Sequence, residues 1–226
     1  MPTLLEHLHQ NAYPGRGIVW SRLPDGSSCG AYFLTGRSEA SRRREIRLGE
    51  HGDLEVVPLD AAQEDDLRHY AAAVETDDWL VYGNGRQVTT VRDRLAAGVP
   101  PVIALQTVEY EPDPPILTAR ITAIVYRTDP SRAWFGIARR PLSDRDAGVV
   151  VTVSVRDLAP GDAILITTYR SDGTTIEPAE VYQEGSTEAA NPAELTDQLW
   201  AALAPERRVA VATFRPEGLR EAVIRD

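Results

Sequence analysis

Residues 149–153 read Val-Val-Val-Thr-Val, and this run decides the fold class. β-branched side chains favour extended backbone, and a run without polar alternation predicts a strand that is buried on both faces within stacked layers. Comparable runs lie on either side of it, at residues 116–126, 133–138, 163–169 and 175–182, with no helical pattern between them. Strands that follow one another without intervening helices pair antiparallel. We therefore expect an α+β fold of stacked antiparallel β-sheets flanked by helices.

The rest of the chain adds further strands and a few helices. Strand-like apolar runs lie at residues 17–21, 30–35, 54–59, 79–82 and 208–214. Helical spacing of apolar residues is confined to 61–74, 91–97 and 191–203, and the last of these opens with Asn191-Pro192, a favoured helix start. No linker-like segment divides the chain, so we expect residues 1–226 to form a single domain.

Length and charge bound the possible function classes. The chain has 226 residues, of which 42% are hydrophobic and 26% charged, enough to bury a large core. Its 34 acidic and 24 basic residues give a net charge of −10, which argues against a nucleic-acid partner. No apolar run reaches the roughly 18 residues of a membrane span, and the first residues lack the basic and apolar parts of a secretory signal. We therefore expect a cytoplasmic protein without a membrane partner.

The residue types exclude several chemistries. All 24 basic residues are Arg, and without Lys neither Schiff-base catalysis nor a P-loop lysine is available. Cys29 is the only cysteine, so an intramolecular disulfide is excluded, although a nucleophilic Cys29 stays a minor alternative. The 4 His residues are scattered, and we expect no metal site.

Guanidinium groups cluster in residues 35–45, Thr-Gly-Arg-Ser-Glu-Ala-Ser-Arg-Arg-Arg-Glu. Arg37 and Arg44, together with the hydroxyls of Ser38 and Ser41, can wrap a phosphate through charge-assisted hydrogen bonds. An exposed basic loop that offsets the acidic surface would have the same sequence. Upstream, the Pro-Gly turn before Arg16 indicates either a ligand contact or a plain strand-entry turn.

Two later segments also carry candidate residues. Tyr82 ends an apolar strand just before Asn84-Gly85, a hairpin signal, and fits either an active-site phenol or a rim aromatic. Residues 109–115, Glu-Tyr-Glu-Pro-Asp-Pro-Pro, hold three carboxylates stiffened by prolines. Such a segment can pre-position a general base, and a rigid acidic surface loop would look alike.

In order and spacing, these segments resemble the archaeal-type IMP cyclohydrolase family. The resemblance is carried by residues 11–18 (Asn-Ala-Tyr-Pro-Gly-Arg-Gly-Ile), 36–44, 81–89, 109–115 and 118–121 (Thr-Ala-Arg-Ile), and is strongest in the first half of the chain. It implies the fold of the N-terminal-nucleophile (Ntn) hydrolases, an αββα sandwich, used without that fold's nucleophile.

The resemblance also implies a reaction. Such an enzyme converts 5-formamidoimidazole-4-carboxamide ribotide, a ribonucleotide, into inosine monophosphate (IMP) and water, or performs a closely related ribotide cyclisation. The carboxamide nitrogen attacks the formyl carbon, so the site must orient both groups, remove a proton and stabilise charge on oxygen. No metal, cofactor or covalent intermediate is implied. The alternative is a non-catalytic protein, derived from this family, that binds a nucleotide or sugar phosphate.

Roles of individual residues follow from the same resemblance. Arg37, Tyr82 and Glu111 are the expected catalytic residues. Arg37 lies nearest the reacting centre, while Tyr82 and Glu111 transfer protons, helped by guanidinium groups that lower the pKa of the phenol. The expected substrate-binding residues are Arg16, Ser38, Ser41, Arg44, Asn84 and Arg120.

Five positions depart from the family pattern, and Val88 and Thr89 are two of them, in place of Thr and Asp. Arg43, Arg86 and Ala119 stand where the family has Asn, Asp and Pro. Two of these exchanges add positive charge. These two exchanges predict a more anionic ligand if the arginines line the pocket, and no change of ligand if they face solvent.

Assembly is expected as well. Strand-rich chains of this size often bury an apolar face between copies, and members of the family commonly assemble. We therefore expect a symmetric homo-oligomer with a small-molecule substrate.

Overall fold

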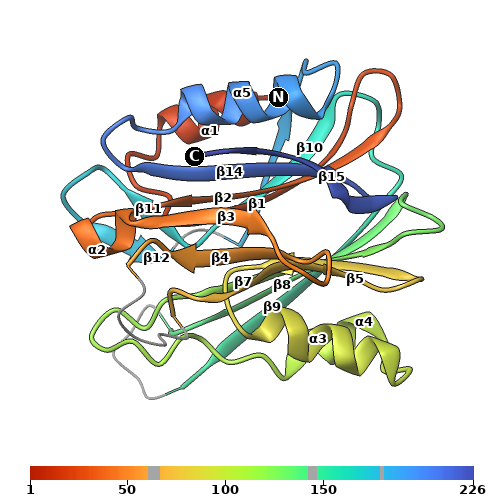
Figure 1. Ribbon diagram of the computed structural model, residues 1–226, viewed down its shortest axis with the longest axis horizontal. Helices are drawn as coiled ribbons and strands as arrows, with labels where there is room; N and C mark the ends of the chain where they lie inside the picture. The colour runs from red at the N-terminus through yellow and green to blue at the C-terminus, as the bar shows by residue number, and fades with distance from the viewer. Residues whose placement is uncertain (61–66, 142–146, 179–180) are drawn as a thin grey trace.

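The computed structural model describes residues 1–60, 67–141, 147–178 and 181–226, which form mostly strands in two main antiparallel sheets (Figure 1). In spatial order, the six-stranded sheet contains β13 (Gln183–Ser186), β10 (Asp162–Thr167), β1 (Arg16–Arg22), β2 (Ser28–Thr35), β14 (Arg208–Arg215) and β15 (Gly218–Arg225). The seven-stranded sheet contains β3 (Arg44–Leu48), β4 (Leu54–Pro58), β5 (Tyr70–Glu75), β6 (Trp79–Gly83), β7 (Arg120–Tyr126), β8 (Arg132–Arg139) and β9 (Val149–Arg156). A small hairpin pairs β11 (Tyr169–Ser171) with β12 (Ile176–Pro178).

Helices cover the outer faces of the two sheets (Figure 1). The six-stranded sheet carries α1 (Leu4–His9) and α5 (Pro192–Ala202), and the seven-stranded sheet carries α3 (Gln87–Ala96) and α4 (Pro101–Gln106). The short α2 (Glu39–Arg42) follows β2. The start expected at Asn191-Pro192 is confirmed, because the Asn191 side chain accepts a hydrogen bond from the Glu194 amide. Two antiparallel sheets with few helices agree with the α+β expectation.

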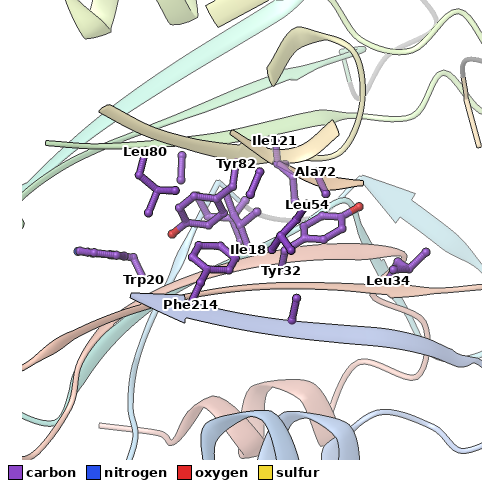
Figure 2. Packing of buried hydrophobic residues seen from close by; sticks show 14 of the residues in the cluster. Ile18, Trp20, Tyr32, Leu34, Leu54, Ala72, Leu80, Tyr82, Ile121 and Phe214 are labelled. Atoms are coloured by element: carbon purple, nitrogen blue, oxygen red, sulfur yellow. The ribbon is translucent and has the colours of Figure 1, made fainter. Parts of the chain in front are cut away.

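The main core lies between the sheets (Figure 2). Successive side chains along β1 point to opposite faces of the sheet. Ile18 and Trp20 therefore point into this core, whereas Val19 belongs to the core beneath α1 and α5. The rings of Tyr82 and Phe214, one from each sheet, meet edge to face with centroids 5.1 Å apart. Aromatic packing therefore holds the two layers together.

The expectation that residues 149–153 are buried on both faces is wrong. They belong to β9, which is an edge strand that pairs only with β8. Its side chains are half-buried or exposed, and Val150 keeps 38% of its surface exposed. Strands between two neighbours, such as β6 and β7, are the ones buried on both faces. Continuous apolar character therefore identified a strand but not its place in the sheet.

The helix expected over 61–74 is also wrong where the structure describes it. Residues 61–66 lie outside the described residues, and Tyr70–Glu75 forms β5 between β4 and β6. Ala72 and Ala73 are fully buried in the core between the sheets. Pairing with two neighbours thus outweighs the helix propensity of alanine. The helix expected at 91–97 is confirmed, although it starts earlier, at Gln87.

Within the described residues, none of the helices is both long enough and apolar enough to cross a membrane.

Candidate active site

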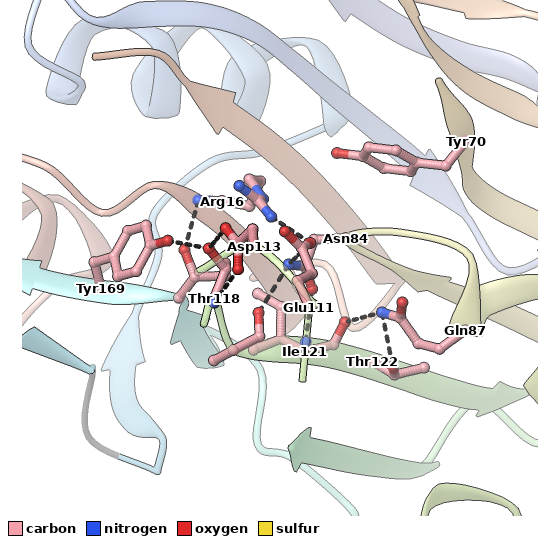
Figure 3. A network of polar contacts seen from close by, with 12 residues as sticks. Arg16, Tyr70, Asn84, Gln87, Glu111, Asp113, Thr118, Ile121, Thr122 and Tyr169 are labelled. Atoms are coloured by element: carbon pink, nitrogen blue, oxygen red, sulfur yellow. Dashed lines mark hydrogen bonds and ion pairs between the residues drawn. The ribbon is translucent and has the colours of Figure 1, made fainter. Parts of the chain in front are cut away.

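The centre of the candidate site is a buried ion pair between Arg16 and Glu111 (Figure 3). Arg16 begins β1, and Glu111 lies in the proline-rich segment that leads to β7. Arg16 Nη2 donates to Glu111 Oε1, and the two residues are only 9% and 4% exposed. Burial raises the pKa of Glu111, and the Arg16 guanidinium opposes that rise. A carboxylate in this environment accepts a proton at a higher pH than an ordinary one.

Asn84 holds Glu111 in place. Its Nδ2 donates to Glu111 Oε1 at 3.2 Å and to the Ala119 carbonyl at 2.9 Å, while its Oδ1 accepts from the Ile121 amide at 2.6 Å. Because Asn84 is fully buried and bonded on both sides, it positions the carboxylate. The direct ligand contact expected for Asn84 stays a prediction.

A second chain of hydrogen bonds joins Tyr169, Thr118 and Asp113 (Figure 3). Asp113 Oδ2 accepts from the Thr118 hydroxyl at 2.6 Å, so that hydroxyl in turn accepts from the Tyr169 hydroxyl. Tyr169 also stacks on Tyr13, with ring centroids 5.7 Å apart. Burial raises the pKa of Tyr169 to about 12, which keeps its hydroxyl protonated.

A cleft of about 210 Å³ opens beside this network. Thr168, Tyr169 and Ala119 form part of its wall, and the Thr168 hydroxyl accepts from the Arg16 amide at 3.1 Å. Three guanidinium groups line the cleft, those of Arg37, Arg139 and Arg140. Through its backbone, Arg16 therefore adjoins the wall of an arginine-lined cleft, although neither Arg16 nor Glu111 lines it.

The loop that carries Arg37 is built by the residues around it. Ser38 and Ser41 form a reciprocal capping box at the start of α2, with N–H···Oγ distances of 3.1 and 2.9 Å. Arg44 is buried, and its Nε donates to the Ser41 carbonyl at 2.8 Å. Of the four residues expected to grip a phosphate here, only Arg37 lines the cleft, and the other three shape its loop.

Tyr82 does not lie where the sequence analysis expected it. Its ring is fully buried in the core between the sheets (Figure 2). Its hydroxyl donates to the Val19 carbonyl at 2.8 Å. Burial raises the pKa of Tyr82 well above its ordinary value, so the expectation that guanidinium groups lower it is wrong. The structure instead brings Tyr32 and Tyr70 near the charge of Arg16, with their hydroxyl oxygens 2.7 Å apart.

Three of the departures from the family pattern, at Arg43, Arg86 and Ala119, have different surroundings. Arg43 is exposed on the surface. Ala119 is buried, and its carbonyl accepts the hydrogen bond from Asn84. Arg86 lines a second cleft together with Arg120, which begins β7 and is half-buried. Arg120 therefore lies near Glu111 but faces a different cleft from Arg37.

Within the part of the chain that the structure describes, no three side chains of His, Cys, Asp or Glu gather as metal ligands would. Cys29 is fully buried, and burial raises the pKa of its thiol to about 12. A thiol in this state is a poor nucleophile.

Comparison with known proteins decides the family. A family described as "IMP cyclohydrolase-like protein" matches residues 13–218. The chain belongs to this family. The resemblance seen in the sequence motifs is thereby confirmed, and the match extends through the second half of the chain, where the motifs are weak.

Two curated relatives of this IMP cyclohydrolase-like chain are named IMP cyclohydrolase. The protein from Methanopyrus kandleri is 36% identical over 130 residues, which cover 55% of this chain and 62% of the relative. The protein from Natronomonas pharaonis is 31% identical over 195 residues, which cover 83% of this chain and 85% of the relative.

Sequence reasoning missed several residues of the IMP cyclohydrolase-like site. Thr118 lies within a recognised motif but received no role, and Tyr169, Arg139 and Arg140 lie in the second half of the chain, where no motif pointed to them. Thr118 and Tyr169 are 51 residues apart. Only the folded chain brings these groups together.

Proposed function

We propose that this chain is an IMP cyclohydrolase that converts 5-formamidoimidazole-4-carboxamide ribotide into IMP and water. Family membership over residues 13–218 and two relatives of that name support the activity. The structural observation that carries the proposal is the buried Arg16–Glu111 pair, whose arginine adjoins the wall of an arginine-lined cleft through its backbone.

Glu111 acts as the general base in this proposal. The carboxamide nitrogen of the substrate forms a bond to the formyl carbon and passes one proton to the Glu111 carboxylate. The raised pKa of Glu111 favours this transfer, because a general base works best when its pKa lies near the working pH. Protonated Glu111 returns this proton to the formyl oxygen, which gives the carbinolamine. The carbinolamine then loses its hydroxyl, together with the proton of the former formamide nitrogen, as water and leaves the closed ring.

Arg16 stabilises the oxygen on which negative charge develops. Among the described residues, its Nε is buried and has no hydrogen-bond partner, although Nη2 binds Glu111. A fixed charged donor held away from water stabilises such an oxygen without costly reorganisation. The Tyr169 hydroxyl, at the cleft wall, becomes a further proton donor when it turns from Thr118 to the substrate.

The phosphate of the ribotide binds Arg37, Arg139 and Arg140 in the cleft. Arg139 Nε is buried without a partner among the described residues, so it has a donor available for an anion. A phosphate dianion needs several fixed donors, which guanidinium groups provide.

The direct test is the absorbance change of purine formation from the formamido ribotide. The Glu111→Gln variant should lower kcat by about 10²–10⁴-fold, because it removes the base. The matched control is Glu188→Gln, the same exchange at an exposed position, and should keep full activity. No turnover by the unaltered protein would overturn the proposal.

A non-catalytic nucleotide or sugar-phosphate binding protein is the second candidate. It is favoured by one observation: Glu111 does not line the cleft. Thermal shift with IMP separates the two functions, because stabilisation without turnover identifies a binder.

We also propose the finer fold assignment, one αββα domain of the Ntn-hydrolase type. The layering of helices and sheets supports it (Figure 1). A single cooperative unfolding transition is expected for one domain, and two separate transitions would contradict it.

Finally, we propose a homo-oligomer that pairs through β9. This edge strand is rich in valine and half-exposed, a combination that promotes association between chains. Light scattering should give a mass above 24.8 kDa for the protein and the monomer mass for Val150→Lys. A monomeric unaltered protein would contradict the proposal.

A further inference from the structure

A second cleft of about 280 Å³ lies where α3 begins, on the outer face of the seven-stranded sheet. Its lining includes Arg86, Arg94 and Arg120, the hydroxyl of Thr90, and Gln87. It shares no lining residue with the cleft that contains Arg37. Its lining is therefore distinct from that of the first cleft, although Arg120 lies near Glu111 of the proposed active site.

The described residues that line this cleft carry more positive than negative charge. Three guanidinium groups line it, against the single carboxylate of Glu109. The other carboxylate near Arg120 is that of Glu111, which already pairs with Arg16. Burial lowers the pKa of Arg120, Glu111 opposes this, and the nearby charge of Arg86 lowers it further. An anion in the cleft would relieve this repulsion between like charges.

Two buried polar atoms at the cleft have no partner among the described residues, Arg120 Nε and Gln87 Oε1. Gln87 is 4% exposed, and its Nε2 donates to the Ile121 carbonyl at 3.3 Å. Because that carbonyl only accepts, the amide orientation is fixed and Oε1 stays an acceptor. The cleft therefore offers an unused donor for an anion and an unused acceptor for a hydroxyl group.

The start of α3 adds to the positive potential. Arg86 occupies the N-cap position, and its own side chain makes no capping hydrogen bond. The amide groups of a helix N-terminus carry partial positive charge and favour anions.

We propose that this second cleft binds a phosphorylated small molecule that also carries hydroxyl groups, such as a sugar phosphate. The phosphate lies among the guanidinium groups of Arg86, Arg94 and Arg120, and a hydroxyl of the ligand donates to Gln87 Oε1. The cleft is close to the lower limit of about 300 Å³ for small-molecule sites, which leaves room beyond a bare phosphate.

Calorimetric titration at constant ionic strength tests the proposal. The protein carries Arg37→Gln, which weakens anion binding in the first cleft, and the probes are inorganic phosphate, ribose 5-phosphate and ribose. Arg86→Gln is compared with Arg92→Gln, because Arg92 belongs to the same helix but pairs with Asp93 and does not line the cleft. Arg86 is exposed and Arg92 is half-buried, so equal melting temperatures without ligand verify that both variants fold.

Ribose 5-phosphate should bind more tightly than phosphate, and ribose should not bind. Arg86→Gln should weaken ribose 5-phosphate binding at least about tenfold, since it removes one charged hydrogen-bonding group. Arg92→Gln should change it less than about twofold. Equal effects of the two exchanges, or no binding at all, would overturn the site. Equal affinities for phosphate and ribose 5-phosphate would overturn the hydroxyl contact.

Discussion

Arg16 and Glu111 are 95 residues apart in the chain, yet their side chains form an ion pair that is nearly withdrawn from solvent. Their side chains are 11% and 5% exposed. Removing one partner of such a pair leaves an uncompensated buried charge, whereas replacing both with apolar groups can be nearly neutral. Comparing single and double replacements of the pair therefore distinguishes its contribution to stability from its contribution to catalysis.

We expect Glu111→Gln to lower the free energy of unfolding by about 3–5 kcal/mol, because Arg16 loses its partner. The double variant Arg16→Met/Glu111→Leu should regain most of that stability but no activity. Urea unfolding and the cyclisation assay measure the two quantities. A double variant that regains activity would exclude Glu111 as the base.

The raised pKa of Glu111 predicts two effects of pH. Activity should fall as pH decreases through this pKa, which lies above the ordinary value of about 4.3, because the base becomes protonated. Between the unfolded and folded pKa values the folded state binds more protons, so this group makes stability decline as pH rises through that window. Glu111→Gln should lack both pH effects. If the variant shows the same pH dependence as the unaltered protein, another group titrates instead of Glu111.

Arg37 and Arg43 provide a matched pair in one loop. Arg37 lines the first cleft, while Arg43 is exposed on the surface. Arg37→Gln should raise KM at least about tenfold through the loss of a charged contact with the phosphate. Arg43→Gln should leave KM unchanged. Steady-state kinetics of both variants decide the matter, and equal KM values would remove Arg37 from the binding site.

Two tyrosines should respond differently to removal of the hydroxyl. Tyr82→Phe leaves the Val19 carbonyl without its donor, so we expect a stability loss of about 0.5–1.5 kcal/mol and little change in kcat. Tyr169→Phe, at the cleft wall, should lower kcat by about tenfold or more. Thermal unfolding and kinetics together test this, and a large loss of kcat in Tyr82→Phe would restore its expected catalytic role.

Cys29 should be inert in the folded protein. It is fully buried, and the pKa of its thiol is raised to about 12. A chromogenic disulfide reagent should react only after denaturant is added. Fast reaction without denaturant, accompanied by loss of activity, would support the alternative of a nucleophilic cysteine.

Much of the fold could be predicted from local pattern, because strands such as β1 and β2 alternate between two cores and read clearly as strands. The position of a strand within its sheet could not be predicted, as β9 illustrates. Burial depends on neighbouring strands that the local sequence does not specify. The helix predicted from the apolar spacing near Tyr70 was wrong for the same reason. Within the site, Arg16, Arg37 and Glu111 were found from motifs, whereas the placement of Tyr82 and Asn84 needed the fold.

The Arg16–Glu111 contact joins a strand of one sheet to the segment that enters the other. We therefore expect turnover to be sensitive to any loosening between the layers, even when each sheet keeps its own backbone pairing. Under gentle denaturation, catalysis should vanish before circular dichroism in the far ultraviolet changes. Loss of activity would then report a loosened contact between the two sheets before any strand pairing is lost.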